Sequence, residues 1–213
     1  LSAILHLSPI NTKICPYQDI AGCKEACLNT AGRGGIIKKG ETTNTIQLAR
    51  ERKTRLFLEA RNIFMTDLIT DIQKFVRYCK KKGKLPCLRL NGTSDIQWEH
   101  IKIDGQNIFE MFPDVQFYDY TKIPTRKVEQ YKNYHLTWSY SEANSKYAQY
   151  FDAIKYNIAV VFHGTMPIYY KGREVIDGDK SDIRFKDKPN VVVGLKAKGK
   201  ARHDSSGFVI HTA

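Results

Sequence analysis

Three cysteines lie close together near the N-terminus, at Cys15, Cys23 and Cys27. Seven residues separate the first pair and three residues separate the second pair. Thiolates are soft ligands that suit iron–sulfur clusters and zinc. A structural zinc site requires four protein ligands, whereas three thiolates on a cubane cluster leave one iron open to a substrate or cofactor. The triplet therefore favours a [4Fe–4S] cluster, with zinc or ordinary free cysteines as the alternatives.

The other two cysteines are interpreted as core residues. Cys79 continues the apolar stripe of a predicted helix, and Cys87 lies inside an apolar strand. We expect no secretory leader, and this expectation and the odd count of five cysteines argue against a disulfide framework. We therefore expect reduced thiols and an intracellular setting.

A second group of candidate site residues follows the ends of predicted strands. Apolar runs at 85–90, 115–118, 135–138, 157–162 and 191–195 each lead into polar residues. Parallel strands present their C-terminal ends on one face of an α/β fold, where ligands bind. The candidates for cofactor binding at these ends are Asn91, Gly92, Thr93, Ser94, Asp95, Asp119, Lys122, Ser139, Ser141 and Glu142.

Helices and strands must position these groups. Helical apolar spacing covers residues 43–60 and 66–81, and a short strand is expected at 3–7. Residues 123–131 and 142–154 are long enough for helices, and a hairpin is expected to turn at Lys171 and Gly172. The alternation of predicted strands and helices indicates one α/β domain over 1–213 with a largely parallel sheet. Its parts are a cysteine-bearing loop (1–41), a helical region (42–84) and a strand–helix region with a C-terminal hairpin (85–213).

The chain is strongly basic, with a formal charge of +12. No acidic residue occurs between Ile72 and Ser94, and lysine or arginine recurs at every second position from 196 to 202. If that second segment is extended, its cations share one face. This charge predicts a phosphate-bearing partner, either nucleic acid or an anionic small molecule. No apolar run is long enough to span a membrane, so we expect no membrane partner.

Several segments resemble an uncharacterised family of tailed-phage proteins, the gene-product-88-like proteins. The resemblance spans nearly the whole chain and rests on residues 15–35, 89–95, 117–122, 133–139, 177–179 and 193–199. The family carries no known function, but it implies a location in the cytoplasm of an infected bacterial host.

More distantly, the layout resembles radical-SAM enzymes. That resemblance implies a partial (β/α) barrel, with Cys15, Cys23 and Cys27 holding a [4Fe–4S] cluster. The open iron would bind S-adenosylmethionine, residues 91–95 would contact its methionine amino group, and Ser139, Ser141 and Glu142 would make polar contacts.

Two functional hypotheses follow. The first is an iron–sulfur enzyme of radical-SAM-like architecture. The second is a non-catalytic protein in which an iron–sulfur or zinc site is structural or redox-sensing and the basic surface binds nucleic acid. The sequence identifies neither catalytic residues nor an oligomeric state.

Overall fold

A computed structural model describes the chain from residue 1 to residue 213, except for residues 10 and 153–155. Two helices, α1 (Thr45–Glu59) and α2 (Arg61–Lys81), are separated only at Ala60 and pack against each other. The Asn44 side chain caps α1 by accepting a hydrogen bond from the Gln47 amide (2.9 Å). The sequence predicted a gap between a helix ending at residue 60 and a helix beginning at residue 66. This gap is wrong, because α2 begins at Arg61, directly after α1.

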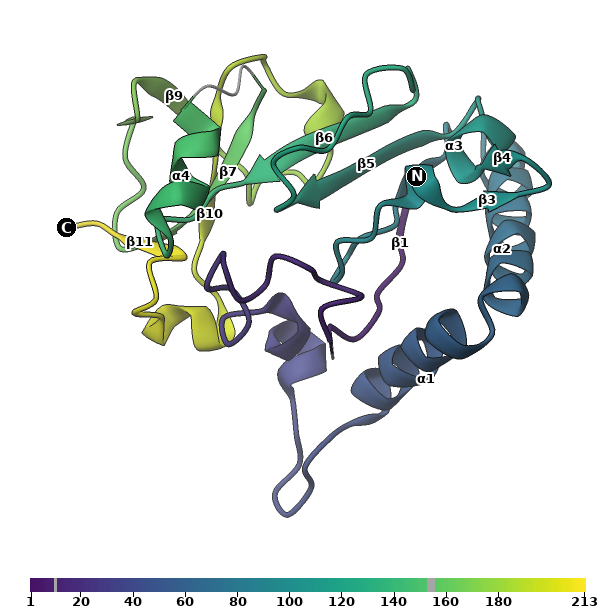
Figure 1. Cartoon of the computed structure of the whole chain (residues 1–213), viewed down its shortest axis with the longest axis horizontal. Coiled ribbons are helices and arrows are strands. Elements are labelled where there is room, and N and C mark those ends of the chain that lie inside the picture. Colours follow the sequence, from purple (N-terminus) through teal and green to yellow (C-terminus); the bar gives the residue numbers. More distant parts are fainter. Residues whose placement is uncertain (10, 153–155) are drawn as a thin grey trace.

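The centre of the fold is a mostly parallel sheet (Figure 1). Strands β1 (Ser2–Ile4), β2 (Cys87–Arg89), β5 (Gln116–Thr121), β6 (Tyr134–Ser139), β7 (Ile158–His163) and β10 (Val192–Lys196) neighbour one another in chain order. Each of these pairs is parallel. This confirms the predicted parallel α/β class.

The sheet continues beyond β10 with β9 (Arg173–Asp177) and then β8 (Tyr169–Tyr170). Strands β8 and β9 form an antiparallel hairpin that turns at Lys171 and Gly172, both with positive φ. Among the described residues, β1 and β8 stand at opposite ends of the strand order. The structure thus shows an open sheet and no closed barrel.

The central strands of the sheet are buried, as expected for a parallel sheet. Strands β5, β6 and β7 are buried along nearly their whole lengths. Such continuous burial is typical of parallel strands that are covered on both faces.

The sheet forks at β7. Strand β10 lies along one edge of β7, from residue 158 to residue 162. The other edge pairs with β6 only at residues 158 and 159, and with β11 (Val209–His211) at residues 161–163. The C-terminal ends of β6 and β7 therefore separate, and the last strand of the sheet fills part of the gap.

Some predicted elements differ from those observed. Residues 123–131 form turns and not the predicted helix, and Arg126 in this stretch makes a buried ion pair with Glu99. The helix expected at 142–154 is the shorter α4 (Ser145–Asp152), and the end of that stretch lies outside the described residues. The basic segment after Lys196 is not extended, because Gly199 has a φ of +56° and begins the turn Gly199–His203.

Short elements complete the fold. They are the hairpin β3 (Lys102–Ile103) and β4 (Gln106–Asn107), the helix α3 (Ile108–Met111), and 3₁₀ turns at Leu28–Thr30, Gly32–Gly35, Trp98–His100 and Arg184–Lys186. None of the helices in the described part of the chain has both the length and the apolar character needed to cross a bilayer.

Candidate cofactor site

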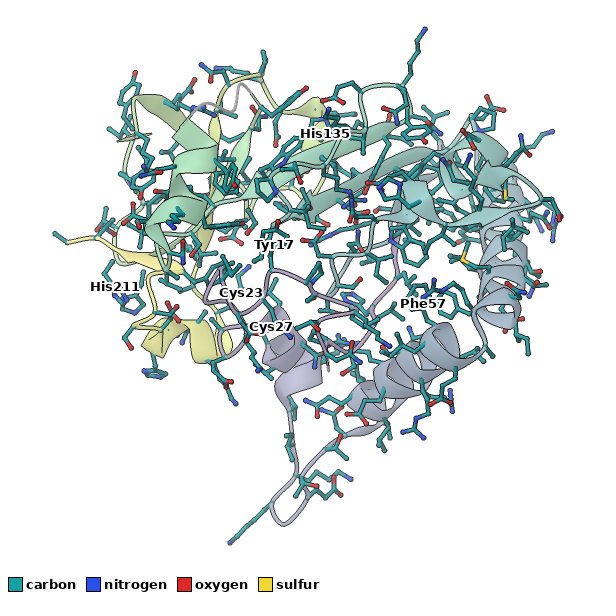
Figure 2. All side chains as sticks on the ribbon, viewed as in Figure 1. Tyr17, Cys23, Cys27, Phe57, His135 and His211 are labelled. Carbon is teal, nitrogen blue, oxygen red and sulfur yellow. The ribbon has the colours of Figure 1, made fainter. Side chains whose placement is uncertain are left out.

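A cavity of about 410 Å³ lies at the C-terminal ends of β2, β5 and β6, next to the fork of the sheet. The thiols of Cys15, Cys23 and Cys27 line it together. Seven of the residues expected at strand ends also line it: Asn91, Gly92, Thr93, Ser94, Asp95, Lys122 and Ser139. Figure 2 shows Cys23 and Cys27 between the strands and the yellow C-terminal segment.

The cysteine loop follows β1 and is held by residues from distant parts of the chain. The Asp95 amide donates to the Ile14 carbonyl (2.9 Å), and Ser141 Oγ donates to the Ala21 carbonyl (2.7 Å). Ser206 Oγ donates to the Gly22 carbonyl (3.0 Å). The loop is thus attached to the end of β2, to the end of β6 and to the segment before β11.

Gly22 allows the sharp bend before Cys23. Its φ is +64°, in the left-handed region that favours glycine. A Cβ atom at this position would lie 2.6 Å from Ser206 Oγ and 2.7 Å from the Ala143 Cβ. Both backbone conformation and space therefore require glycine here.

The three thiols of the loop are free and partly buried. Burial raises the pKa of Cys15 well above the ordinary thiol value, and it also raises the pKa of Cys23. Cys27 Sγ accepts a hydrogen bond from the Asn29 amide (3.4 Å). In the metal-free protein, Cys15 and Cys23 are therefore neutral thiols, and a metal must displace their protons.

No three His, Cys, Asp or Glu side chains in the described part of the chain are arranged to hold one metal ion. The donors of a single zinc all lie within about 2.3 Å of it and so crowd together. Cys79 and Cys87 do not line the cavity, and Figure 2 places His135 and His211 away from the labelled cysteines. The arrangement does not resemble a preformed mononuclear zinc site.

Lys122 places a positive charge beside the thiols. Its Nζ donates to Ser139 Oγ (3.0 Å) and lies 5.2 Å from the centre of the Phe208 ring. Burial lowers the pKa of Lys122, but Cys23 and Cys15, when they are ionised, and Asp95 raise it by more, so the net pKa is above the ordinary value. Beside ionised thiols, the ammonium group is therefore charged at neutral pH.

The side chains of segment 91–95 are held by hydrogen bonds within the segment, to residues just after it and to Leu7. Asn91 Oδ1 accepts from Ser94 Oγ, the Ile96 amide and Trp98 Nε1 at 2.9, 2.9 and 3.1 Å. Thr93 Oγ1 donates to the Leu7 carbonyl (2.5 Å). These side chains shape the wall of the cavity. The side-chain oxygen of Asn91 already accepts three hydrogen bonds and is therefore not available to a ligand.

Asp95 connects the cavity to a buried ion-pair network. Its carboxylate accepts from Thr121 Oγ1 (2.8 Å) and from the Lys122 amide (2.6 Å). Arg126 contacts it at 3.5 Å and makes a two-pronged ion pair with Glu99, with both distances 2.7 Å. Burial raises the pKa of Asp95, and Arg126 opposes this effect.

Three residues expected in the site lie outside the cavity lining. Asp119 is buried below it and accepts from the Asn91 amide (2.7 Å), and burial raises its pKa to about 7. Ser141 is used to hold the cysteine loop. Glu142 points away and accepts from the hydroxyls of Tyr140 (3.1 Å) and Tyr170 (2.6 Å). Ser141 and Glu142 follow a strand end, but the chain has already turned away from the cavity there.

The family model described as gene product 88 matches residues 1–212. The chain belongs to the gene product 88 family. This confirms the resemblance to a phage gene-product family that the sequence motifs indicated. No curated protein and no solved structure matches the chain.

Several residues lining the cavity of this gene product 88 family member were missed in the sequence. They include Gln18, Arg89, Tyr120, Thr121, Asp179 and Asp182. Arg89 offered a signal, because it is a charged residue inside an otherwise apolar predicted strand. No local sequence pattern places Asp179 and Asp182 at the cavity, because the long-range path of the β9–β10 connection brings them there.

Proposed function

We propose that this protein binds a [4Fe–4S] cluster through Cys15, Cys23 and Cys27 and holds a small zwitterionic molecule beside it. S-adenosylmethionine is the first candidate for that molecule. One observation carries the proposal: the three thiols of a single loop line the same cavity as the polar ends of β2, β5 and β6.

The donor set supports a cluster over a single metal ion. Each thiolate of a cluster binds a different iron, so the three sulfurs need not converge on one point, whereas the ligands of a mononuclear site must. Such a cluster with three protein thiolates supplies an iron with an open coordination position. Lys122 favours the loaded state, because its ammonium offsets the negative charge that the thiolates bring into a poorly solvated cavity.

The polar groups around the thiols suit a zwitterion. The Lys122 ammonium is placed to attract a carboxylate, and the Asp95 carboxylate is placed to attract an ammonium group. A radical-SAM partial barrel is part of the proposal, and it would need parallel strands that neighbour one another in chain order, with the cysteine loop between β1 and β2. The proposal includes catalysis by radical chemistry.

Anaerobic purification tests the cluster. We expect a brown protein with about four irons per chain, the cubane stoichiometry. Alanine replacement of Cys15, Cys23 or Cys27 should abolish the colour, while Cys87→Ala should retain it because Cys87 lies away from the cavity. A colourless wild-type protein that holds one zinc would overturn the proposal.

Titration with S-adenosylmethionine tests the ligand. Binding at the open iron should change the electron paramagnetic resonance spectrum of the reduced cluster, and Lys122→Met should weaken that change. An unchanged spectrum at saturating S-adenosylmethionine would remove this ligand while leaving the cluster itself in place.

A second candidate function is favoured by the end of α2. Lys74, Arg77, Lys80 and Lys81 are exposed there, and Lys82 and Lys84 follow, also exposed. Such a cluster suits the phosphate backbone of nucleic acid, for which affinity falls steeply with salt. A filter-binding series in rising salt tests it, with Lys80→Ala/Lys81→Ala expected to reduce the salt dependence. No binding at about 50 mM salt, where phosphate contacts are strong, would exclude it.

A further inference from the structure

The cavity has a second wall that is formed by the β9–β10 connection. This connection passes over the sheet from β9 to the side of β2, where Asp182 contacts Arg89, and Phe185 packs against Tyr118. Gly178, Asp179 and Asp182 of the connection line the cavity, together with Arg89, Tyr120 and the end of β10. The cysteines are not part of this wall.

Arg89 is held rigidly in it. Its guanidinium lies over the Tyr120 ring, with the central carbon 4.6 Å from the ring centre. Its Nη1 contacts both carboxylate oxygens of Asp182, at 3.2 and 3.3 Å. The Nε is buried and has no acceptor among the described residues. Asp182 thus engages only one nitrogen of a group that can donate five hydrogen bonds.

The two lysines at the end of β10 differ in their pairing. Lys198 Nζ pairs with Asp179 at 2.5 Å, and the other oxygen of that carboxylate accepts from the Lys196 amide (2.9 Å). The Lys196 ammonium has no carboxylate partner in the part of the chain that the structure describes. The wall therefore carries three cations, Arg89, Lys196 and Lys198, against the two acids Asp179 and Asp182.

The surroundings add to this positive charge. Arg50 and Lys53 of α1 lie near His6, and they join Arg89 in lowering its pKa. Burial is the larger cause, and together these effects bring the pKa of His6 to about 4. Asp182 acts in the opposite direction, so the electrostatic surroundings of His6 contain three cations and one acid of the wall.

We propose that this wall is an oxyanion subsite, in which Lys196 and Arg89 bind the carboxylate or phosphate group of the small molecule on which the protein acts. Only the identity of the bound molecule as the substrate of the protein rests on the proposed function, because anion binding itself needs no cluster. Guanidinium and ammonium groups are the usual partners of both oxyanions, and a partly enclosed site strengthens the attraction.

Calorimetry on cluster-free protein tests the subsite, with inorganic phosphate and acetate as separate probes at low salt. We expect one of the two to bind, and the tighter one identifies the oxyanion. Lys196→Ala should weaken it by about tenfold, the usual scale for one charge-assisted hydrogen bond. Lys200→Ala is the matched control, because Lys200 is also exposed but does not line the cavity.

Two results would overturn the subsite. One is the absence of binding by either anion, and the other is equal weakening by Lys196→Ala and Lys200→Ala, which would indicate a general charge effect. Iron content measured on the same variants separates the two proposals. Anion binding without a cluster would leave the subsite and remove the proposed function, and a cluster without anion binding would do the reverse.

Discussion

The Lys122 ammonium donates a hydrogen bond to Ser139 Oγ over 3.0 Å, which joins the C-terminal end of β5 to that of β6 inside the cavity. The same ammonium faces the thiols of the cysteine loop. Lys122→Met removes this charge and leaves the backbone hydrogen bond from the residue 122 amide to Asp95 intact. We expect reconstituted protein to retain several-fold less iron, because the thiolates lose their compensating cation.

Lys146→Met serves as the control for that experiment, since Lys146 is exposed on α4 and does not line the cavity. Iron and sulfide analysis after gel filtration measures the effect. Equal iron retention in the two variants would show that Lys122 does not support the thiolates.

The raised pKa of Cys15 and Cys23 predicts slow alkylation. The thiolate is the reactive form, and burial keeps these two thiols protonated at neutral pH. Metal-free native protein should therefore react with iodoacetamide at Cys15 and Cys23 much more slowly than the urea-unfolded chain does. Peptide mass spectrometry over time measures both rates, and equal rates in the two states would contradict the burial of these thiols.

Gly22→Ala should disrupt the cysteine loop without unfolding the sheet. The substitution strains a backbone at φ +64° and places a methyl group against Ser206 and Ala143. We expect a loss of about 1–3 kcal/mol in the free energy of unfolding. We also expect reduced iron content. Gly172→Ala is the control, because that glycine also has a positive φ but nothing lies within 4 Å of the added methyl group. Loss of iron in both variants alike would contradict a specific role of the Gly22 contacts.

Buried Asp119 and half-buried His6 predict opposing pH effects on stability. Asp119 has its pKa raised from 3.8 to about 7, so between these values the native state holds a proton that the unfolded chain has lost. Stability should therefore fall as pH rises through this window, by up to ~1.4 kcal/mol per pH unit. His6 has its pKa lowered from 6.5 to about 4, so between these values the unfolded chain holds the extra proton and stability should rise with pH.

Single variants separate these contributions. Asp119→Asn should leave a stability that rises between pH 4 and 6.5, and His6→Gln should leave one that falls over the same range. Urea denaturation at several pH values measures both slopes. Identical pH profiles for the two variants would exclude the assignment.

The sequence predicted the parallel class of the sheet because its strands are continuous apolar runs with clear polar ends. Strands β5, β6, β7 and β10 lie within one to three residues of their expected positions. Strand-end reasoning also brought Asn91, Lys122 and Ser139 to the thiols, since the geometry of parallel strands is general.

Other features could not be predicted, because they depend on contacts between distant residues. The β11 strand has three residues and gains its place only by pairing with β7 at the fork. Arg89 and Tyr120 were missed because they lie inside strands, where a local pattern does not indicate which side chains a distant connection will meet. The turn at Gly199 likewise ended an alternation of lysines that the sequence alone suggested was extended.

The fork at β7 has a consequence for biosynthesis. The cysteine loop is translated early, yet its enclosure depends on Ser141, Ser206 and Phe208, which leave the ribosome much later. Until Val209–His211 pair with β7, this side of the cysteine loop lacks its cover. If the proposed cluster binds there, it would enter most easily on the nascent or newly released chain, before the last strand is in place.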